Sequence, residues 1–214
     1  MSRLFAMDGK LAVFLNKMAD LVILNLLWLV CCIPVVTAGA ATTAFAYELL
    51  KLARDEESYV FTGFFRQFKE SFRQSTIVWL VYLLIGMVVY FDIRALGMMD
   101  LPGKPVLTMV LYIAAFLALA SMFYAFPIMA FFRNSVKKVF RNSLLMSIAH
   151  LPWTLLIILI NLCPVFFLLF GNAIAACFVD VVIGFCLAGW ANAHIFRRLF
   201  DRYTKGAETN GEKV

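Results

Sequence analysis

The chain has 214 residues, of which 64% are hydrophobic and 15% are charged, and its mean hydropathy is +0.89. This composition excludes an ordinary water-soluble globular protein, and the length leaves room for one helical bundle without a second domain. The formal net charge is +6. Because the basic residues stand beside the ends of apolar segments, they indicate membrane topology and not nucleic-acid binding.

Five apolar segments follow one another along the chain. Residues 21–47, 74–91, 105–132 and 142–179 contain no Asp, Glu, Lys or Arg, and residues 181–196 form a fifth segment. A helix crosses the hydrocarbon core of a bilayer with about 20 apolar residues. We therefore expect an all-α fold, a polytopic transmembrane helix bundle in the lipid bilayer. It would form a single domain over residues 1–203 with about five spans and kinked helices, at residues 18–47, 75–91, 106–132, 143–170 and 173–196.

The first span contains a proline in its middle. Proline lacks a backbone donor and clashes with the preceding turn, so we expect a helix break at Pro34 and Gly39. If the helix breaks, residues 38–53 form a separate helix. Residues 21–36, followed by Ala38-Gly39-Ala40, also resemble a signal peptide with its cleavage site, although the uncharged stretch continues to Tyr47.

An aromatic and basic segment lies between the first two spans. Its phenylalanines fall on one helical face and its charged residues on the others, which predicts a cytoplasmic amphipathic helix within residues 51–73. This helix would either lie flat on the membrane surface or pack against the bundle. We take as a candidate docking face for a partner the residues Phe64, Phe65, Arg66, Phe68, Phe72 and Arg73.

The 38-residue segment at 142–179 is too long for one upright helix. Gly171-Asn172 is its clearest turn signal, so we divide it there into two spans and expect kinks at Pro152 and Pro164. After residue 203 the chain is polar, and we expect a disordered tail over residues 204–214.

The basic residues predict an orientation. With five spans, 14 of the 19 Lys and Arg residues fall on one side of the membrane. The positive-inside tendency places that side in the cytoplasm. We expect a multi-pass protein of the bacterial plasma membrane, with the N-terminus outside and the C-terminus in the cytoplasm.

No catalytic or nucleotide-binding motif is visible in the sequence. The five cysteines show no CxxC spacing, and neither histidine has a cysteine near it. We expect a protein that is not an enzyme and holds no cofactor and no metal. An ionisable residue inside a span is costly, so Asp180, together with Asn161 and Asn25, forms a candidate intramembrane polar site. Its role is either functional or a structural one between helices.

Two sequence blocks carry a family resemblance. Residues 24–47, which read LNLLWLVCCIPVVTAGAATTAFAY, are followed by FFRQFKESFRQ at residues 64–74. Both blocks resemble the YesL-type bacterial membrane proteins. The resemblance implies an inner-membrane location and an association with carbohydrate uptake, and it supplies no catalytic residue.

Two functions follow as expectations. The first is a non-enzymatic accessory or regulatory protein of an ABC-type carbohydrate uptake system, with permease or ATPase subunits as partners. The alternative is a small transporter for a sugar or related solute, in which proline-broken helices surround a polar site. The sequence leaves the ligand, the identity of the partner and any homo-oligomer open.

Overall fold

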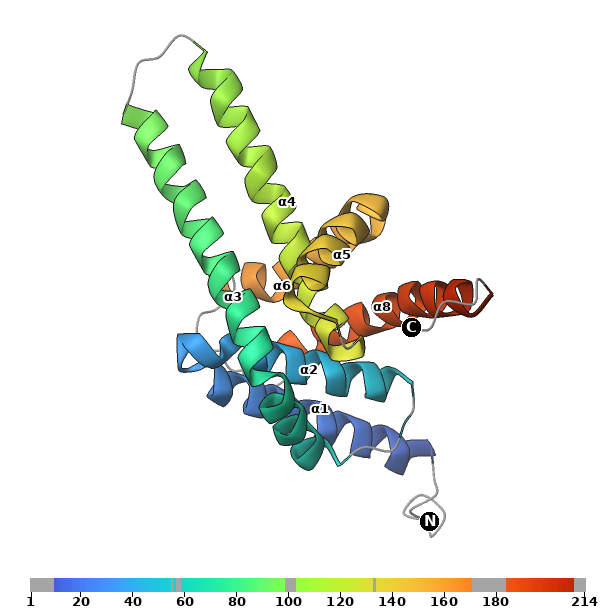
Figure 1. Cartoon of the computed structure of the whole chain (residues 1–214). Helices are drawn as coiled ribbons and strands as arrows, with labels where there is room; N and C mark the ends of the chain where they lie inside the picture. Colours follow the sequence, from blue (N-terminus) through green and yellow to red (C-terminus); the bar gives the residue numbers. More distant parts are fainter. Residues whose placement is uncertain are drawn as a thin grey trace.

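The computed structural model describes residues 10–54, 56, 59–98, 103–132, 134–170 and 184–209. These residues form helices and turns, with no strand among them, which confirms the expected all-α class. The elements are α1 (Lys10–Cys32), the 3-10 helix η1 (Val35–Thr37), α2 (Ala38–Ala53), α3 (Val60–Met98), α4 (Lys104–Phe131), α5 (Val136–Ala149), α6 (Leu151–Phe170) and α8 (Phe185–Thr209), as Figure 1 shows.

Three of the described helices are long and apolar enough to cross a membrane, namely α1, α3 and α4. The bent pair of α5 and α6 makes a fourth if it counts as one span. The chain is thus a multi-pass membrane protein, with fewer such helices among the described residues than the five spans expected.

The first apolar segment is two helices and not one kinked span. It breaks between Cys32 and Ala38, where Pro34 is extended at φ −76° and ψ 116°. Thr37 Oγ1 donates to the carbonyl oxygens of Cys31 and Pro34, at 2.7 Å and 2.8 Å. This hydroxyl therefore pairs carbonyl groups at the break. Trp79 Nε1 donates to Val35 O at 2.8 Å and ties the break to α3.

Gly39 does not break the helix. It lies in the first turn of α2 and is buried against α3, where an added Cβ would stand 2.5 Å from Trp79 Cβ. The role expected for Gly39 is thus corrected: it lets two helices approach closely, and Pro34 alone accounts for the break.

Helix α3 contains two elements that we expect from the sequence to be separate helices. It runs without interruption for 39 residues, through both the aromatic segment and the expected span at 75–91. No proline or glycine lies between residues 64 and 85, so nothing stops the backbone hydrogen bonds where the charged residues end. Of the two arrangements left open for the aromatic segment, packing against the bundle is the one found, because its Phe64 is fully buried.

The expected span at 143–170 is sharply bent. The α5 and α6 axes meet at 100° beside His150, two residues before Pro152. Proline has no N–H to donate and its ring clashes with the carbonyl group four residues earlier, so α5 cannot continue through Pro152. Thr154 Oγ1 donates to Ser147 O at 2.8 Å across the bend. By contrast, α6 runs through Pro164, where we expect a kink.

Helix α8 ends at Thr209, so residues 204–209, expected to belong to a disordered tail, continue the helix. Extending an existing helix costs far less than starting one, which accounts for this continuation. The first part of the expected span at 173–196 and residues 210–214 lie outside the described residues.

Helix α2 is central to the fold and contacts α1, α3, α4 and α8. It forms an antiparallel hairpin with α1, in which Trp28 Nε1 donates to Thr42 Oγ1 at 3.2 Å. Its small residues Ala40, Ala41 and Ala44 are fully buried and allow this close packing. Helices α3 and α4 form a second hairpin that extends beyond the rest of the molecule (Figure 1).

Candidate functional site

A cavity of about 330 Å³ lies between α1, α2, α4, α6 and α8. Aromatic rings make up much of its wall, and no charged side chain is among the described residues that line it. The six rings belong to Trp28, Phe45, Phe123, Phe126, Phe185 and Phe196. A cavity of this composition suits an apolar molecule and offers little to a charged one.

The aromatic wall has a defined geometry. The Trp28 ring lies 5.2 Å from that of Phe45 and 5.5 Å from that of Phe185, centroid to centroid. Its indole N–H is paired with Thr42, whose hydroxyl donates in turn to Ala38 O at 2.8 Å. The polar atoms of Trp28 and Thr42 are therefore already paired within the protein.

Two amide side chains, Asn161 of α6 and Asn192 of α8, also line the cavity. Asn161 is half-buried, and its Nδ2 donates to Ile157 O, one turn earlier, at 2.8 Å. Asn192 is 6% exposed, and its buried Oδ1 accepts no hydrogen bond from the described residues. The cavity is thus an apolar space whose wall includes two amide side chains.

The expected polar site is only partly assembled. Asn161 lines the cavity, whereas Asn25 of α1 is fully buried and is not among the lining residues. Asp180 lies outside the described residues. Asn192 is the residue that joins Asn161 at the cavity, and the sequence alone did not single it out because nothing local distinguishes it from other amides in apolar helices.

The expected docking face does not exist as one surface. Phe64 belongs to the core, and Phe65 and Phe68 are half-buried against it. Phe72, Arg66 and Arg73 are exposed. The stripe of rings is covered mainly by the chain's own helices, because burying them among neighbouring helices removes their apolar area from water. Of these six residues, Phe72 and the two arginines remain exposed.

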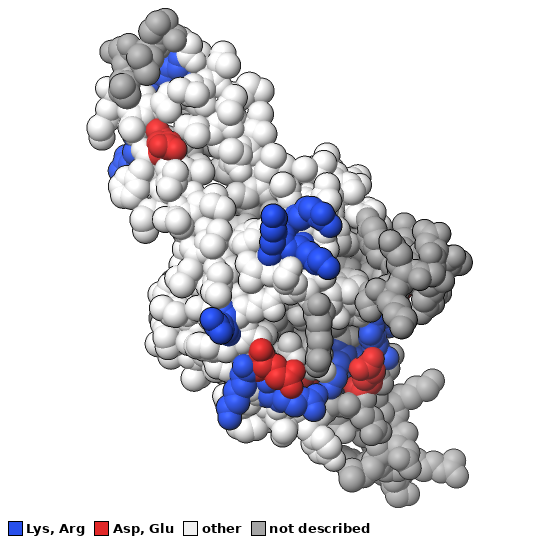
Figure 2. Space-filling view, viewed as in Figure 1, with Lys and Arg blue, Asp and Glu red and all other residues white. Residues whose placement is uncertain are grey.

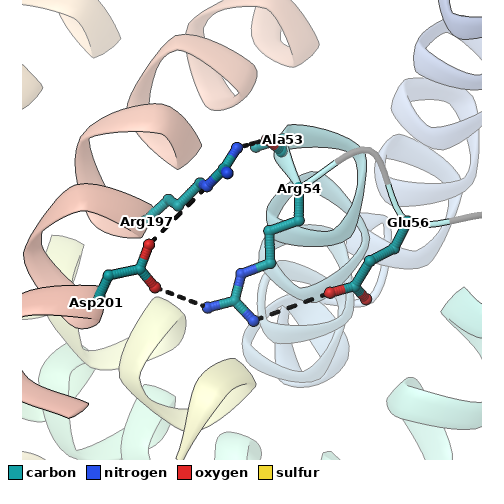
Figure 3. Close-up of polar contacts among 5 residues, drawn as sticks. All are labelled: Ala53, Arg54, Glu56, Arg197 and Asp201. Carbon is teal, nitrogen blue, oxygen red and sulfur yellow. Dashed lines mark hydrogen bonds and ion pairs between the residues drawn. The ribbon is translucent and has the colours of Figure 1, made fainter. Parts of the chain in front are cut away.

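A group of charged side chains links the end of α2 to the middle of α8, as Figure 3 shows. Arg54, directly after α2, donates to Asp201 of α8 at 3.2 Å and stands 4.5 Å from the centre of the Phe131 ring at the end of α4. Arg197 of α8 donates to Ala53 O, the last residue of α2. A cation at a helix C-terminus is favourable, so this cluster holds the ends of α2 and α4 together beside the middle of α8.

Glu48 is a buried acidic residue that the sequence analysis did not select. It is fully buried on α2, and Gly63 of α3 leaves room for its carboxyl group. The sequence did contain a signal for its burial. Ala41 and Ala44 stand seven and four residues before Glu48, and Leu52 stands four residues after it, so all four lie on the same buried helix face. We did not select Glu48 from the sequence because it follows the uncharged segment at residues 21–47 and does not lie within it.

The comparisons show two similarities. Residues 21–93 match a protein family described as "Protein of unknown function, DUF624". The chain is also 27% identical over 169 residues to the uncharacterized protein YteU of Bacillus subtilis (strain 168), covering 76% of this chain and 74% of that protein. No solved structure matches the chain. The family match covers the second half of α1, all of α2 and most of α3, including the break at Pro34.

Proposed function

We propose that the protein is a non-enzymatic accessory or regulatory protein of an ABC-type carbohydrate uptake system in the bacterial plasma membrane. The likeness of residues 24–47 and 64–74 to the YesL-type proteins supports the association with carbohydrate uptake. The exposed apolar hairpin of α3 and α4 supports partner binding, and it replaces the aromatic face as the docking element.

The hairpin carries this proposal because the rest of the bundle leaves its outer half uncovered. Residues 83–88 of α3 are exposed without interruption. Six successive residues of an α-helix cover its full circumference. On α4, Met109 and Val110 are exposed as well. Such a pair of helices offers apolar faces to lipid and to the helices of a membrane partner.

The distribution of charged side chains indicates that the docking region lies within the membrane. Figure 2 shows charged side chains at the tip of the hairpin and again from the middle of the molecule to its opposite end, with an uncharged zone between the tip and the middle. The residues at the tip include Asp92, Arg94 and Lys104. A partner that binds the uncharged zone is therefore an integral membrane subunit, which favours the permease over the ATPase.

Gly86 provides a probe of this surface. A Cβ added there meets no atom within 4 Å, so Gly86→Leu adds bulk without a clash in the fold. We expect permease subunits to co-purify with the tagged chain after mild solubilisation, and Gly86→Leu to reduce their yield. Thr62→Leu, an exposed position in the charged half of the same helix, serves as the matched control. Recovery of the chain alone would count against the proposal.

The cavity favours a second candidate function, a small transporter. Its apolar wall offers few partners for the hydroxyl groups of a sugar, and each unpaired buried hydroxyl is costly. The geometry therefore fits an apolar solute better than a carbohydrate. Uptake into vesicles reconstituted with the purified chain separates this candidate from the accessory role, because an accessory protein moves nothing without its partner.

The helical hairpin at Pro34 supports an orientation different from the one expected from a single first span. An external N-terminus depends on a single span over residues 18–47, whereas α1 and α2 run in opposite directions (Figure 1). The contacts of Arg54 with Asp201 and Phe131 bring the ends of α2 and α4 together with the second half of α8. By their order in the sequence, 17 of the 19 Lys and Arg residues, all except Arg94 and Lys104, would then belong to the side where these segments lie. The positive-inside tendency then supports a cytoplasmic location for both termini.

A further inference from the structure

One face of α5 carries positive charge without an acidic partner. Lys137, Lys138 and Arg141 are exposed, and none of them forms an ion pair with another residue that the structure describes. The sequence contains no Asp or Glu from residue 101 to residue 179. Figure 2 shows a group of Lys and Arg side chains in the middle of the molecule, at the level of α5 in Figure 1, with no acidic side chain beside it. This basic face of α5 therefore offers its charge to a ligand.

The arrangement is unfavourable for the helix itself. Lys137 and Arg141 stand four residues apart, so they lie one turn above the other, where like charges repel. Lys137 and Lys138 also lie in the first turn of α5, which contains no acidic residue. That turn is the positive end of the helix dipole, where acidic side chains are favourable and basic ones are not. A negatively charged group bound to the basic face would relieve both costs.

A contact between α3 and the start of α5 places the basic face at the boundary of the membrane. Gln74 begins the uncharged run at residues 74–91 of α3, and its side chain donates to Asn134 O, two residues before α5 starts. The 18 residues of this run rise about 27 Å, close to the hydrocarbon thickness of about 30 Å. Gln74 therefore stands at one edge of the hydrocarbon core, and the start of α5 lies beside it at the level of the lipid headgroups.

The second half of the same helix face is apolar. Leu144, Leu145 and Ile148 are exposed and follow the basic residues at helical spacing. Helix α5 runs back along α4, because Ser143 and Ser121 pair at 3.0 Å and Ser121 lies ten residues before α4 ends at Phe131. The apolar half of the face thus points away from the headgroup level and into the hydrocarbon. Charge followed by apolar surface is the order in which a phospholipid presents its phosphate and its acyl chains.

We propose that this face of α5 binds an anionic phospholipid of the cytoplasmic leaflet. Its headgroup phosphate would lie among Lys137, Lys138 and Arg141, with an acyl chain against Leu144 and Ile148. A zwitterionic lipid carries its own cation and gains less there. One basic residue beside an anionic membrane surface favours binding by about five-fold, which corresponds to about 1 kcal/mol. The inference goes beyond the accessory role, because lipid binding requires no uptake partner.

Photolabelling of the purified full chain in phosphatidylcholine nanodiscs tests the proposal. Two probes with identical acyl chains, each carrying a diazirine, are compared: phosphatidylglycerol and phosphatidylcholine. Peptide mapping compares the label on α5 with the label on residues 83–88 of α3, which are exposed and serve as the internal reference. We expect phosphatidylglycerol to exceed phosphatidylcholine at least five-fold on α5 and the two probes to label residues 83–88 equally. The preference on α5 should fall near 1 M salt, where the screening length is about 3 Å.

Two variants separate charge from structure. The triple variant Lys137→Gln, Lys138→Gln, Arg141→Gln should lose the preference for phosphatidylglycerol on α5 while keeping the label from phosphatidylcholine. The charge-preserving variant Lys137→Arg, Lys138→Arg, Arg141→Lys should retain the preference. Circular dichroism checks that both variants stay helical.

A matched control removes the same amount of charge elsewhere. It replaces three exposed basic residues that each have an acidic residue within four positions along the chain. The control variant is Arg66→Gln, Lys69→Gln, Arg198→Gln. Its preference on α5 should equal that of the unmodified chain, because the basic face is intact.

Four results would overturn the proposal. They are an equal ratio of the two probes on α5 and on residues 83–88, a triple variant that keeps the preference, and a control variant that loses it. The fourth is suppression of the α5 label by free glycerol phosphate, which would identify a soluble anion as the ligand. Loss of partner co-purification in the hairpin experiment would change none of these measurements, so the two proposals fail separately.

Discussion

Gly39 of α2 lies against the backbone of Ser75 in α3, so closely that a Cβ atom at Gly39 would stand 2.6 Å from the Ser75 carbonyl oxygen. Beside this contact, the hydroxyls of Thr43 and Ser75 share a hydrogen bond of 2.9 Å, and both side chains are fully buried. The crossing of the two helices thus combines a small residue with a pair of hydroxyls, which is how apolar helices associate without a hydrophobic driving force.

Gly39→Ala should destabilise the fold, because a backbone oxygen and the Cβ of Trp79 cannot move aside without separating the helices. Overpacking of this kind costs about 1–3 kcal/mol. Gly86→Ala is the control, since its Cβ meets open space, and it should be neutral or stabilising by up to about 1 kcal/mol. Thermal unfolding in detergent, followed by circular dichroism, compares the two. Equal melting temperatures would show that the helices are not in close contact.

Gly63→Ala should also destabilise, for a different reason. The added Cβ would enter the space of the Glu48 carboxyl group, which is fully buried and has little room to move. In a Glu48→Ala background that space is vacated, so the cost of Gly63→Ala should fall. A double-mutant cycle on unfolding free energies measures this coupling. If the two effects simply add, the carboxyl group does not occupy the position beside Gly63.

Local effects of single residues could be predicted from the sequence. The consequence of Pro34 is local, since the ring removes a donor in its own turn, and the chain breaks where this was expected. The continuity of α3 was missed for the opposite reason. Hydropathy changes sharply near Gln74, but the backbone hydrogen bonds of a helix do not depend on whether its side chains are charged.

Contacts between distant segments could not be predicted. The spacing of the phenylalanines indicated an apolar helix face, but lipid, a partner or the chain's own helices can cover such a face, and only packing decides that Phe64 is in the core. Similarly, Asn161 and Asn192 stand 31 positions apart. Each is recognisable as a polar residue in an apolar helix, yet nothing in the spacing places both on one cavity.

Tyr82→Phe should weaken the junction of α3, α4 and α5. The Tyr82 hydroxyl lies 2.5 Å from Ser121 Oγ and 3.3 Å from Ser143 Oγ. The two serines are 3.0 Å apart and remain paired in the variant. The expected loss is therefore small, about 0.6 kcal/mol, as is typical of hydrogen bonds between membrane helices. Tyr90→Phe, at an exposed position of the same helix, should have no effect on unfolding. A loss above about 2 kcal/mol would mean that all three hydroxyls depend on Tyr82.

Asp201→Asn should have a small, salt-dependent effect. The side chains of Arg54 and Asp201 are 29% and 45% exposed, so water weakens their attraction. We expect a loss below about 1 kcal/mol at low ionic strength. The difference from the unmodified chain should disappear near 1 M salt, where the screening length is about 3 Å. A large loss that persists in high salt would instead identify the contact as a buried ion pair.

Reporter fusions should place both termini in the cytoplasm. Green fluorescent protein fused to the N-terminus or to the C-terminus should fluoresce. Insertion directly after Met98, where α3 ends, should give no fluorescence, since the reporter does not mature after export. Only two of the 19 Lys and Arg residues, Arg94 and Lys104, belong to this side by their order in the sequence. The positive-inside tendency therefore places this side outside the cytoplasm. An exported N-terminal reporter beside a cytoplasmic C-terminal one would restore the single first span, and α1 and α2 could then not form a hairpin about Pro34 in the membrane.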